Sequence, residues 1–253
     1  MSSPNSLSSP NYFRPYLGVI YDLDGTLLQS PQDYPAMRRM VIDLAHRAGL
    51  PPGELNVHMT IPHLLGFTRD RMQQLGLPPG MYLRFEAEVN RRLDALELEA
   101  LPGVRSSPDA LEHLTRMHAS GYRLGVLTRS SEAFARQALH QTGMLPLLDR
   151  LRTRSDSGPI KPDPESLRVL LADLGVPRDR AVFVGDMPAD LECASGAAVD
   201  FVALVLEGPN AAAREEEMRR KGARRLSHSF RELHRELTGA AMDPAHPGAS
   251  PPR

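Results

Sequence analysis

A short apolar segment that ends on two aspartates constrains this chain more than any other feature. Residues 19–26 read Val-Ile-Tyr-Asp-Leu-Asp-Gly-Thr, so Asp22 and Asp24 follow an apolar run and are separated by one residue. Alternate residues of a strand point to the same face, and two carboxylates there repel each other unless a divalent cation or shared protonation compensates. Gly25 allows a tight turn at the strand end, where open α/β sheets place their chemistry.

The composition sets limits on the class of protein. The 253 residues carry a formal net charge of −1, and 41% of them are hydrophobic. This balance favours neither a nucleic-acid polymer nor an anionic membrane as a partner, and no apolar run is long enough for a transmembrane helix. The N-terminus lacks the pattern of a signal peptide. The single cysteine, Cys193, lies in an apolar helical pattern and is interpreted as a small core residue, so we expect a cytoplasmic protein.

Apolar segments alternate with helical patterns through most of the chain. This alternation predicts an α/β fold, a Rossmann-like parallel sheet covered by helices on both faces. Helices are expected over about 107–119 and 164–174. The expected strands are Leu17–Tyr21, Arg123–Leu127, Ala181–Val184 and Phe201–Val205, with a shorter one at Leu147–Thr153.

Residues 30–101 break this alternation, because they show helical periodicity and no convincing strand. Helices are predicted at Tyr34–Ala48 and Met81–Leu98, separated by Pro- and Gly-rich breaks. A helical block inserted directly after the first strand is typical of a cap over that strand's carboxyl end. The predicted organisation is a disordered N-terminal tail at 1–15, a catalytic core of 16–29 plus 102–238, a helical cap at 30–101 and a flexible tail at 239–253.

Three further polar clusters lie near the ends of predicted elements. Thr128-Arg129-Ser130-Ser131 follows one strand, Lys161-Pro162 precedes a helix, and Gly185-Asp186 follows another strand with Asp190 four residues later. Several carboxylates with one lysine make an oxygen-rich site that suits Mg²⁺. A hydroxyl, a lysine and backbone N–H groups are what phosphoryl transfer requires. One carboxylate can then attack phosphorus, and another can exchange the proton of the leaving alcohol.

The order of these four motifs resembles that of the haloacid dehalogenase superfamily, in particular the branch of phosphoglycolate phosphatase and β-phosphoglucomutase with a helical cap. The resemblance implies an aspartyl-phosphate on Asp22 and a general acid/base at Asp24. It also implies Mg²⁺ held by Asp22, Asp24 and Asp186, with Thr26 and Asp190 supporting the site. The residues that the resemblance assigns to the phosphate or the substrate are Leu23, Gly25, Thr128, Arg129 and Lys161, of which Lys161 is also catalytic.

We therefore predict an Mg²⁺-dependent phosphatase that acts on a small phosphomonoester, as a monomer or homodimer. Phosphoglycolate, sugar phosphates and nucleotides all remain open as substrates. A phosphomutase and a non-catalytic phospholigand-binding module are the alternatives. Two positions depart from the family pattern: Arg129 stands where an asparagine is common, and Tyr34 where the mutases tend to carry a histidine, although Gly66–Arg69 resembles a mutase-like cap loop. The cap residues that either contact the substrate or lie on a solvated face are His58, His63, Arg69 and Arg71.

Overall fold

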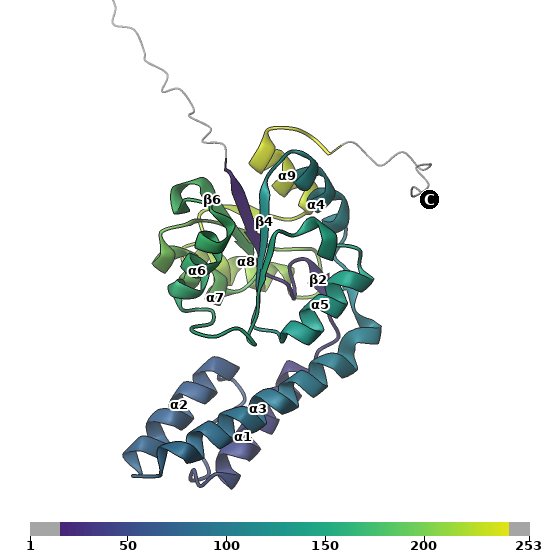
Figure 1. The fold of residues 1–253 in the computed structure, drawn as a ribbon. Coiled ribbons are helices and arrows are strands. Elements are labelled where there is room, and N and C mark those ends of the chain that lie inside the picture. Colours follow the sequence, from purple (N-terminus) through teal and green to yellow (C-terminus); the bar gives the residue numbers. More distant parts are fainter. Residues whose placement is uncertain (1–15, 243–253) are drawn as a thin grey trace, which may run out of the picture.

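The computed structural model describes residues 16–242 and contains a six-stranded parallel sheet with the strand order β5-β4-β1-β6-β7-β8 (Figure 1). The strands are β1 (Gly18–Tyr21), β4 (Arg123–Leu127), β5 (Arg150–Arg152), β6 (Ala181–Gly185), β7 (Asp200–Leu204) and β8 (Leu226–Ser227). The central strand β1 pairs with β4 on one side and with β6 on the other, and it is buried along its whole length. The predicted parallel α/β sheet with an inserted helical cap is confirmed.

Alternating side chains of the sheet build two separate apolar layers. Val19 and Tyr21 of β1 point toward the layer that contains α4 (Ala110–Ala119), α5 (Glu132–Gln141) and α9 (Phe230–Thr238). Ile20 points to the opposite layer, against α6 (Pro164–Leu174) and α7 (Pro188–Ala197), where Cys193 is buried as predicted. A strand covered on both faces has few polar positions, which is why these strands read as continuous apolar runs in the sequence.

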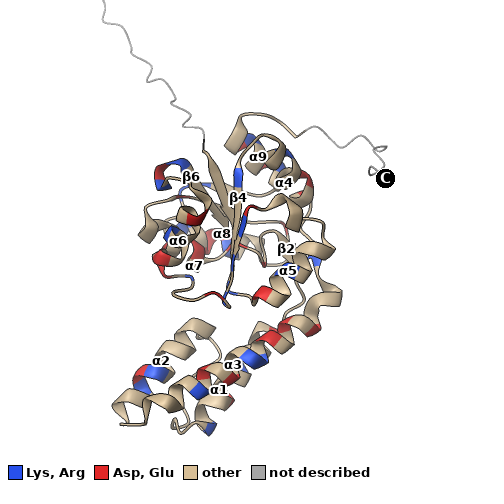
Figure 2. Cartoon of the chain, in the orientation of Figure 1, with Lys and Arg blue, Asp and Glu red and all other residues tan. Residues whose placement is uncertain are grey.

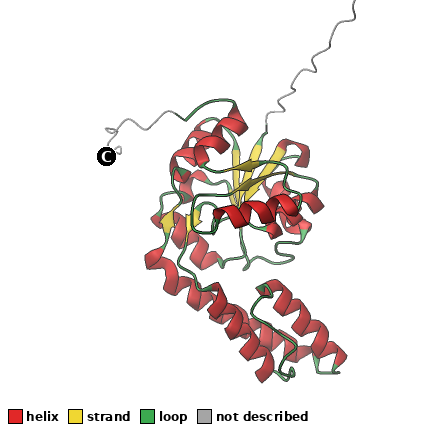
Figure 3. Ribbon diagram, turned by 180° about the vertical axis from the view of Figure 1, so that it is seen from behind, coloured by secondary structure: helices red, strands yellow, loops and turns green. Residues whose placement is uncertain are grey.

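The helical block after β1 forms a second core of its own. It consists of α1 (Tyr34–Arg47), α2 (Ile61–Gln74) and α3 (Pro79–Ala100), whose buried side chains make one apolar cluster. The chain leaves the sheet through β2 (Leu28–Gln29) and returns through β3 (Arg105–Ser106). These two strands pair antiparallel and lie at the junction between the two parts (Figure 3). Figure 2 shows acidic and basic residues interspersed over both parts of the chain.

Several predicted bounds needed correction. The helix expected from residue 107 begins at Ala110, because Asp109 adopts a left-handed conformation with φ of 59°. The fifth strand is confined to β5, since Leu145–Leu147 form a 3₁₀ turn. Gly66–Arg69 lie inside α2, a helix that was not predicted from the sequence, and therefore form no cap loop. The alternating charges of Arg214–Lys221 predict an exposed helix, and α8 (Ala211–Arg220) forms there but begins three residues earlier.

The two predicted tails lie largely outside the described residues. The tail at 1–15 is outside them entirely, and of 239–253 only residues 239–242 are described. In that short stretch Gly239 ends α9, and the buried Met242 accepts a hydrogen bond from Arg231 through its carbonyl. Between residues 16 and 242 no helix is both long and apolar enough to cross a membrane.

A row of contacting polar side chains is buried in the layer between the sheet and the helices α4 and α9. The hydroxyl of Tyr21 lies 2.7 Å from Nε2 of His113, and Nδ1 of His113 lies 3.2 Å from Nδ1 of His234. Phe230 packs against the same imidazole. Burial, together with the neighbouring His234, lowers the pKa of His113 to about 3. The folded protein therefore keeps this imidazole neutral well below the pH at which an unfolded chain protonates it.

This difference predicts acid sensitivity of the fold. Below about pH 6.5 the unfolded state binds a proton at His113, whereas the folded state does not. The free energy of unfolding therefore falls as the pH falls toward 3. Between pH 7.5 and pH 5.5 this group should remove about 1.4 kcal/mol from the free energy of unfolding. His113→Gln does not titrate and should lose correspondingly less over this interval in urea unfolding. Equal losses in the two proteins would contradict the assignment.

Candidate active site

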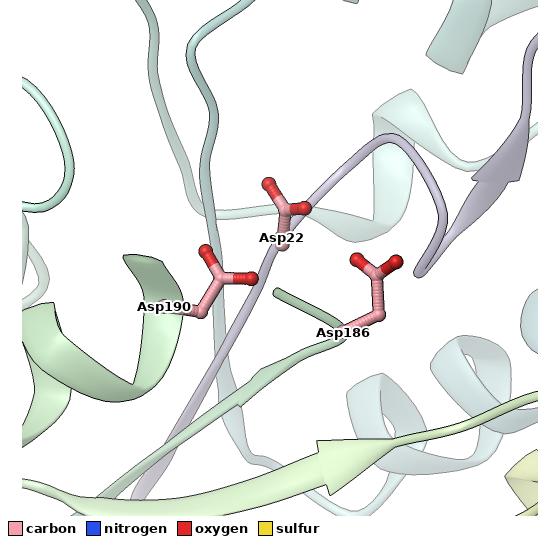
Figure 4. A group of neighbouring side chains, drawn as sticks. All are labelled: Asp22, Asp186 and Asp190. Carbon is pink, nitrogen blue, oxygen red and sulfur yellow. The ribbon is translucent and has the colours of Figure 1, made fainter. Parts of the chain in front are cut away.

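The carboxyl ends of the central strands bring most of the predicted site residues together. Asp22 follows β1, Thr128 follows β4 and Asp186 follows β6. Lys161, in the loop before α6, and Asp190, in the first turn of α7, reach the same edge. Figure 4 shows the carboxyl groups of the three aspartates Asp22, Asp186 and Asp190 side by side. A parallel sheet collects such residues because all of its strands end at one edge.

The Lys161 ammonium is the centre of the site's charge arrangement. Its side chain is only 2% exposed, and it donates to Oδ1 of Asp22 and, at 2.8 Å, to Oδ1 of Asp190. Burial lowers the pKa of Lys161, but Asp190 and Asp22 more than offset this effect, so the pKa is raised. Lys161 therefore stays charged at neutral pH and can bind a phosphoryl oxygen next to Asp22.

The acidic groups exceed the positive charge that the buried lysine supplies. Ligand oxygens of Asp22, Asp186 and Asp190 all lie within 4.8 Å of one another. Burial and the Asp190 carboxyl raise the pKa of Asp22 to about 6 against the opposing effect of Lys161. Burial and Asp22 likewise raise the pKa of Asp186 well above its usual range. Since a divalent cation compensates clustered carboxylates, this group suits a hard cation that prefers oxygen ligands.

The contacts of Asp190 separate it from the other two acids. Besides accepting from Lys161, it accepts from the backbone N–H of Met187 at 3.1 Å through Oδ2. Both of its oxygens are therefore engaged, one by the lysine and the other by the backbone at the start of α7. Asp190 therefore holds the lysine, while Asp22 and Asp186, which directly follow β1 and β6, could hold a cation.

Gly25 is required where the chain passes Asp186. Its φ is +86°, and a Cβ at this position would lie 2.4 Å from Oδ2 of Asp186. Thr26 then donates to Oδ1 of the same aspartate at 3.3 Å. Leu23, by contrast, places its side chain in the apolar core, so this residue can contribute only its backbone to the site. The first motif therefore positions Asp186 as well as carrying its own two acids.

The carboxyl group of Asp24 is held apart from the acidic cluster. It accepts from the Ser130 hydroxyl at 2.7 Å and from the Gln32 side-chain amide at 3.3 Å. Burial raises its pKa to about 7 although the bond from Ser130 opposes this shift. A carboxyl group with a pKa near neutrality can both donate and accept a proton at working pH. This is the property that a general acid/base needs.

The second motif supplies a hydroxyl and a cation to the site. Thr128 is buried, and its hydroxyl oxygen accepts from the N–H of Ser130 at 3.0 Å. Arg129 lines the cavity beside it, and its guanidinium forms no ion pair with any residue between 16 and 242. An unpaired cation next to Thr128 is available to an anionic group of a ligand.

A buried ion pair between the cap and the core was not identified from the sequence. Glu97 of α3 accepts from Arg154 at 2.8 Å and from the N–H of Ser131 at 2.9 Å, and Arg154 also donates to Asp94 at 2.6 Å. Arg154 further donates to the carbonyl of Arg129 at 2.9 Å. We call these residues, Glu97 with Arg154 and Asp94, the cap–core ion pair. The sequence did carry a signal, because Glu97 continues the buried series Phe85, Val89 and Leu93 at intervals of four.

A second missed residue is Arg214 of α8. Its Nη1 lies 3.5 Å from Oδ2 of Asp186, and its Nη2 donates to the Leu206 carbonyl at 2.8 Å. The alternating charges of residues 214–221 are typical of an exposed helix face, so the sequence did not indicate this contact. The arginine offsets part of the negative charge at Asp186.

Four cap residues were predicted either to contact the substrate or to lie on a solvated face, and all four lie away from the site. Arg71 pairs with Glu54 at 2.6 Å, and Arg69 pairs with the neighbouring Asp70 at 3.0 Å. Neither these arginines nor His58 and His63 line the cavity over the aspartates, which has a volume of about 370 Å³. In this structure their contacts are those of a solvated cap surface.

The comparisons with known proteins agree with this geometry. A family model described as haloacid dehalogenase-like hydrolase matches residues 19–204. The chain belongs to this family. It is 32% identical over 205 residues to the phosphoglycolate phosphatase of Rhodospirillum rubrum, covering 74% of this chain and 78% of that one. It is 31% identical over 244 residues to the plasmid phosphoglycolate phosphatase of Cupriavidus necator, with 91% and 97% covered.

A solved structure gives the same fold. The hydrolase from Pseudomonas syringae superposes with a TM-score of 0.61 at 22% identity, covering 89% of this chain and all of that one. Together with the curated relatives, the family assignment makes this haloacid dehalogenase-like protein a phosphoric monoester hydrolase, as the sequence predicted. Enzymes of this kind use a divalent metal ion, and the aspartate cluster of this chain could bind one.

The cap–core ion pair makes a stability prediction with an internal control. Glu97 has a side chain that is 4% exposed, so Glu97→Ala leaves the buried Arg154 guanidinium and the Ser131 N–H without a main partner. We expect a loss of about 3 kcal/mol in the free energy of unfolding. Asp94 pairs with the same arginine but is 44% exposed, so Asp94→Ala should cost less than about 1 kcal/mol. Urea unfolding measures both, and similar losses would refute the ranking.

Proposed function

We propose that this phosphatase hydrolyses a small phosphomonoester through an aspartyl-phosphate on Asp22, with Mg²⁺ as its cofactor. The observation that supports this most strongly is that the two carboxyl groups after β1, those of Asp22 and Asp24, lie in different surroundings. Asp22 faces Lys161 and the acidic cluster, whereas Asp24 faces Ser130 and Gln32. Two carboxyl groups in such different surroundings are suited to two different roles.

The first half of the reaction transfers the phosphoryl group to the protein. The ionised carboxylate of Asp22 attacks phosphorus, and the bond between phosphorus and the ester oxygen breaks. Asp24, protonated at the outset, gives its proton to the departing alkoxide, so that a neutral alcohol leaves. In this proposal Lys161, Thr128 and Arg129 bind the phosphoryl oxygens while their charge is redistributed, which is supported by Thr128 and Arg129 lining the cavity and by Lys161 bonding to Asp22.

The second half returns the protein to its starting state. Asp24, now ionised, takes a proton from a water molecule, and the resulting hydroxide attacks phosphorus. The bond between phosphorus and the Asp22 oxygen breaks, which releases inorganic phosphate and regenerates the carboxylate. Asp24 is protonated again and ready for another ester. A pKa of about 7 allows Asp24 to take either form at neutral pH.

The proposed ligands for Mg²⁺ are the side chains of Asp22 and Asp186 and the backbone carbonyl of Asp24. The raised pKa values of the two side chains support this, because burial and neighbouring carboxylates disfavour their ionised forms and a bound cation would offset both effects. When bound, Mg²⁺ supplies positive charge to the phosphoryl oxygens and reduces their repulsion toward an attacking carboxylate. Gly25 and Thr26 keep Asp186 in place from the opposite side.

Phosphate release from a panel of phosphomonoesters tests the function. We expect release in Mg²⁺, none in EDTA, and restoration when Mg²⁺ is added back. Asp22→Asn should keep the fold, judged by circular dichroism, and lower kcat by on the order of a thousandfold or more. Release that persists at wild-type rates in Asp22→Asn would show that another residue is the nucleophile. Conversion of sugar phosphates without net release would instead identify a mutase.

The role of Asp24 makes a prediction that depends on the leaving group. Asp24→Asn removes the proton donor but leaves the nucleophile. The rate of reaction with alkyl phosphates should therefore fall by on the order of a hundredfold or more. With p-nitrophenyl phosphate the leaving group needs no proton. This variant should then release about one equivalent of p-nitrophenol in a rapid phase and stall, because no base activates water for the second step.

Rapid-quench measurements distinguish the possible outcomes for this variant. Trapped phosphoprotein in Asp24→Asn that is absent in the double variant with Asp22→Asn would support both roles. Equal slowing of alkyl and p-nitrophenyl esters, with no rapid phase, would contradict the role of Asp24 in protonating the alcohol. Ser130→Ala is a useful comparison, since it removes the 2.7 Å hydrogen bond but keeps the carboxyl group.

A further inference from the structure

The cavity over the aspartates has two chemically different ends. At the core end lie Asp22, Asp24, Thr128 and Asp186, which the proposed reaction uses for the phosphoryl group. At the other end the cap contributes apolar side chains, and Ile160 from the core adds another. These cap residues are Met37 of α1, Ile61, Pro62 and Leu65 of α2, and Leu93 of α3. Whatever alcohol the phosphoryl group is attached to must lie against this apolar wall.

Several polar side chains that the cap brings to the cavity already have partners. Tyr34 of α1 also lines it, on the side of the aspartates, where burial and the nearby Asp24 raise its pKa. Thr60 caps the start of α2, where its hydroxyl accepts from the N–H of His63 at 3.4 Å. Arg38 donates to the Val57 carbonyl at 3.3 Å. Arg154 and Glu97 are occupied by each other. Of the cavity's basic side chains, Arg38 and Arg129 have no acidic partner among residues 16–242, and Arg129 neighbours Thr128 at the phosphoryl end.

The shape of the wall follows from helix geometry. Ile61 and Leu65 are four residues apart in α2, so they lie on one face of the helix and form a continuous surface. Both are only partly buried, which leaves apolar area for a ligand to cover. The cavity volume of about 370 Å³ lies in the range of sites that enclose ligands much larger than a two-carbon acid.

We propose that the preferred substrate is the phosphomonoester of an alcohol that carries an aromatic or heterocyclic ring, which packs on Ile61 and Leu65, and not a short polar acid such as phosphoglycolate. The proposal rests on the phosphatase function above. A ring covers apolar area without needing new hydrogen-bond partners in the cap. A short polar leaving group would leave most of the wall uncovered.

Competing esters of primary alcohols test this preference. Pyridoxal phosphate and adenosine monophosphate carry rings, whereas phosphoglycolate and glycerol phosphate do not. We expect kcat/KM for at least one ring-bearing ester to exceed that for phosphoglycolate by about tenfold or more. Leu65→Trp fills the wall and Leu65→Ala removes part of it, so both should reduce this ratio several-fold. Leu83→Trp is the matched control, because Leu83 is 63% exposed and lies outside the cavity, and it should leave the ratio unchanged.

Binding measured without turnover separates this proposal from the catalytic one. In the Asp22→Asn background, isothermal titration with the same esters should show tighter binding of a ring-bearing ester, which Leu65→Trp weakens more than it weakens phosphoglycolate. Preference for phosphoglycolate in both assays, with no effect of Leu65 on the ratio, would overturn the ring proposal and leave the phosphatase intact. Ring-selective binding with no hydrolysis of any ester would overturn the phosphatase and support the ring-binding wall.

Discussion

The rest of the site depends on the buried ammonium of Lys161, which lies between Asp22 and Asp190. An isolated charge in this position would be very costly, and so would the carboxylates without it. Because the lysine is bonded to both acids, it fixes Asp22 at the end of β1 and ties the loop before α6 to the first turn of α7. Lys161 and Arg214 together cannot neutralise three ionised aspartates, and burial together with Asp22 raises the pKa of Asp186. The core is thus stable enough to fold around the acids while still favouring an added cation.

The cap is connected to this chemistry by charge as well as by the chain. Glu97 reaches from α3 to the N–H of Ser131, next to Ser130, whose hydroxyl holds Asp24. A movement of the cap helix would therefore change the surroundings of the second-motif loop. Burial is the main cause of the raised pKa of Asp24, and the nearby negative charge of Glu97 adds to it. Two hydrogen bonds and one peptide bond join Glu97, Ser131, Ser130 and Asp24 in a row. The position of the cap is thereby linked to the protonation state of the proposed acid.

Much of this architecture could be predicted from the sequence because it depends on local rules. Strands buried on both faces appear as apolar runs, and the motif residues follow those runs, so Asp22, Thr128 and Asp186 could be placed at one sheet edge in advance. The parts that were missed depend on tertiary contacts. The helix α2 has a Gly at position 66 and many polar residues, so its periodicity is weak, and it is stabilised by packing on α1 and α3. Arg214 lies in a run of alternating charges, where nothing local distinguishes it from its exposed neighbours.

The same distinction explains why the chemistry of the substrate's phosphate is easier to predict than the identity of its alcohol. Phosphoryl transfer needs a few ionisable side chains in fixed positions, and such residues are conspicuous near the ends of apolar strands. Recognition of the alcohol is assigned here to Ile61, Leu65 and other aliphatic residues of the cap, which in sequence look like any residue of a small helical core. His63 and Arg69, which are chemically more conspicuous, lie on the cap away from the cavity. Binding selectivity of this kind comes from shape and apolar area, and these appear only when the cap and the core are seen together.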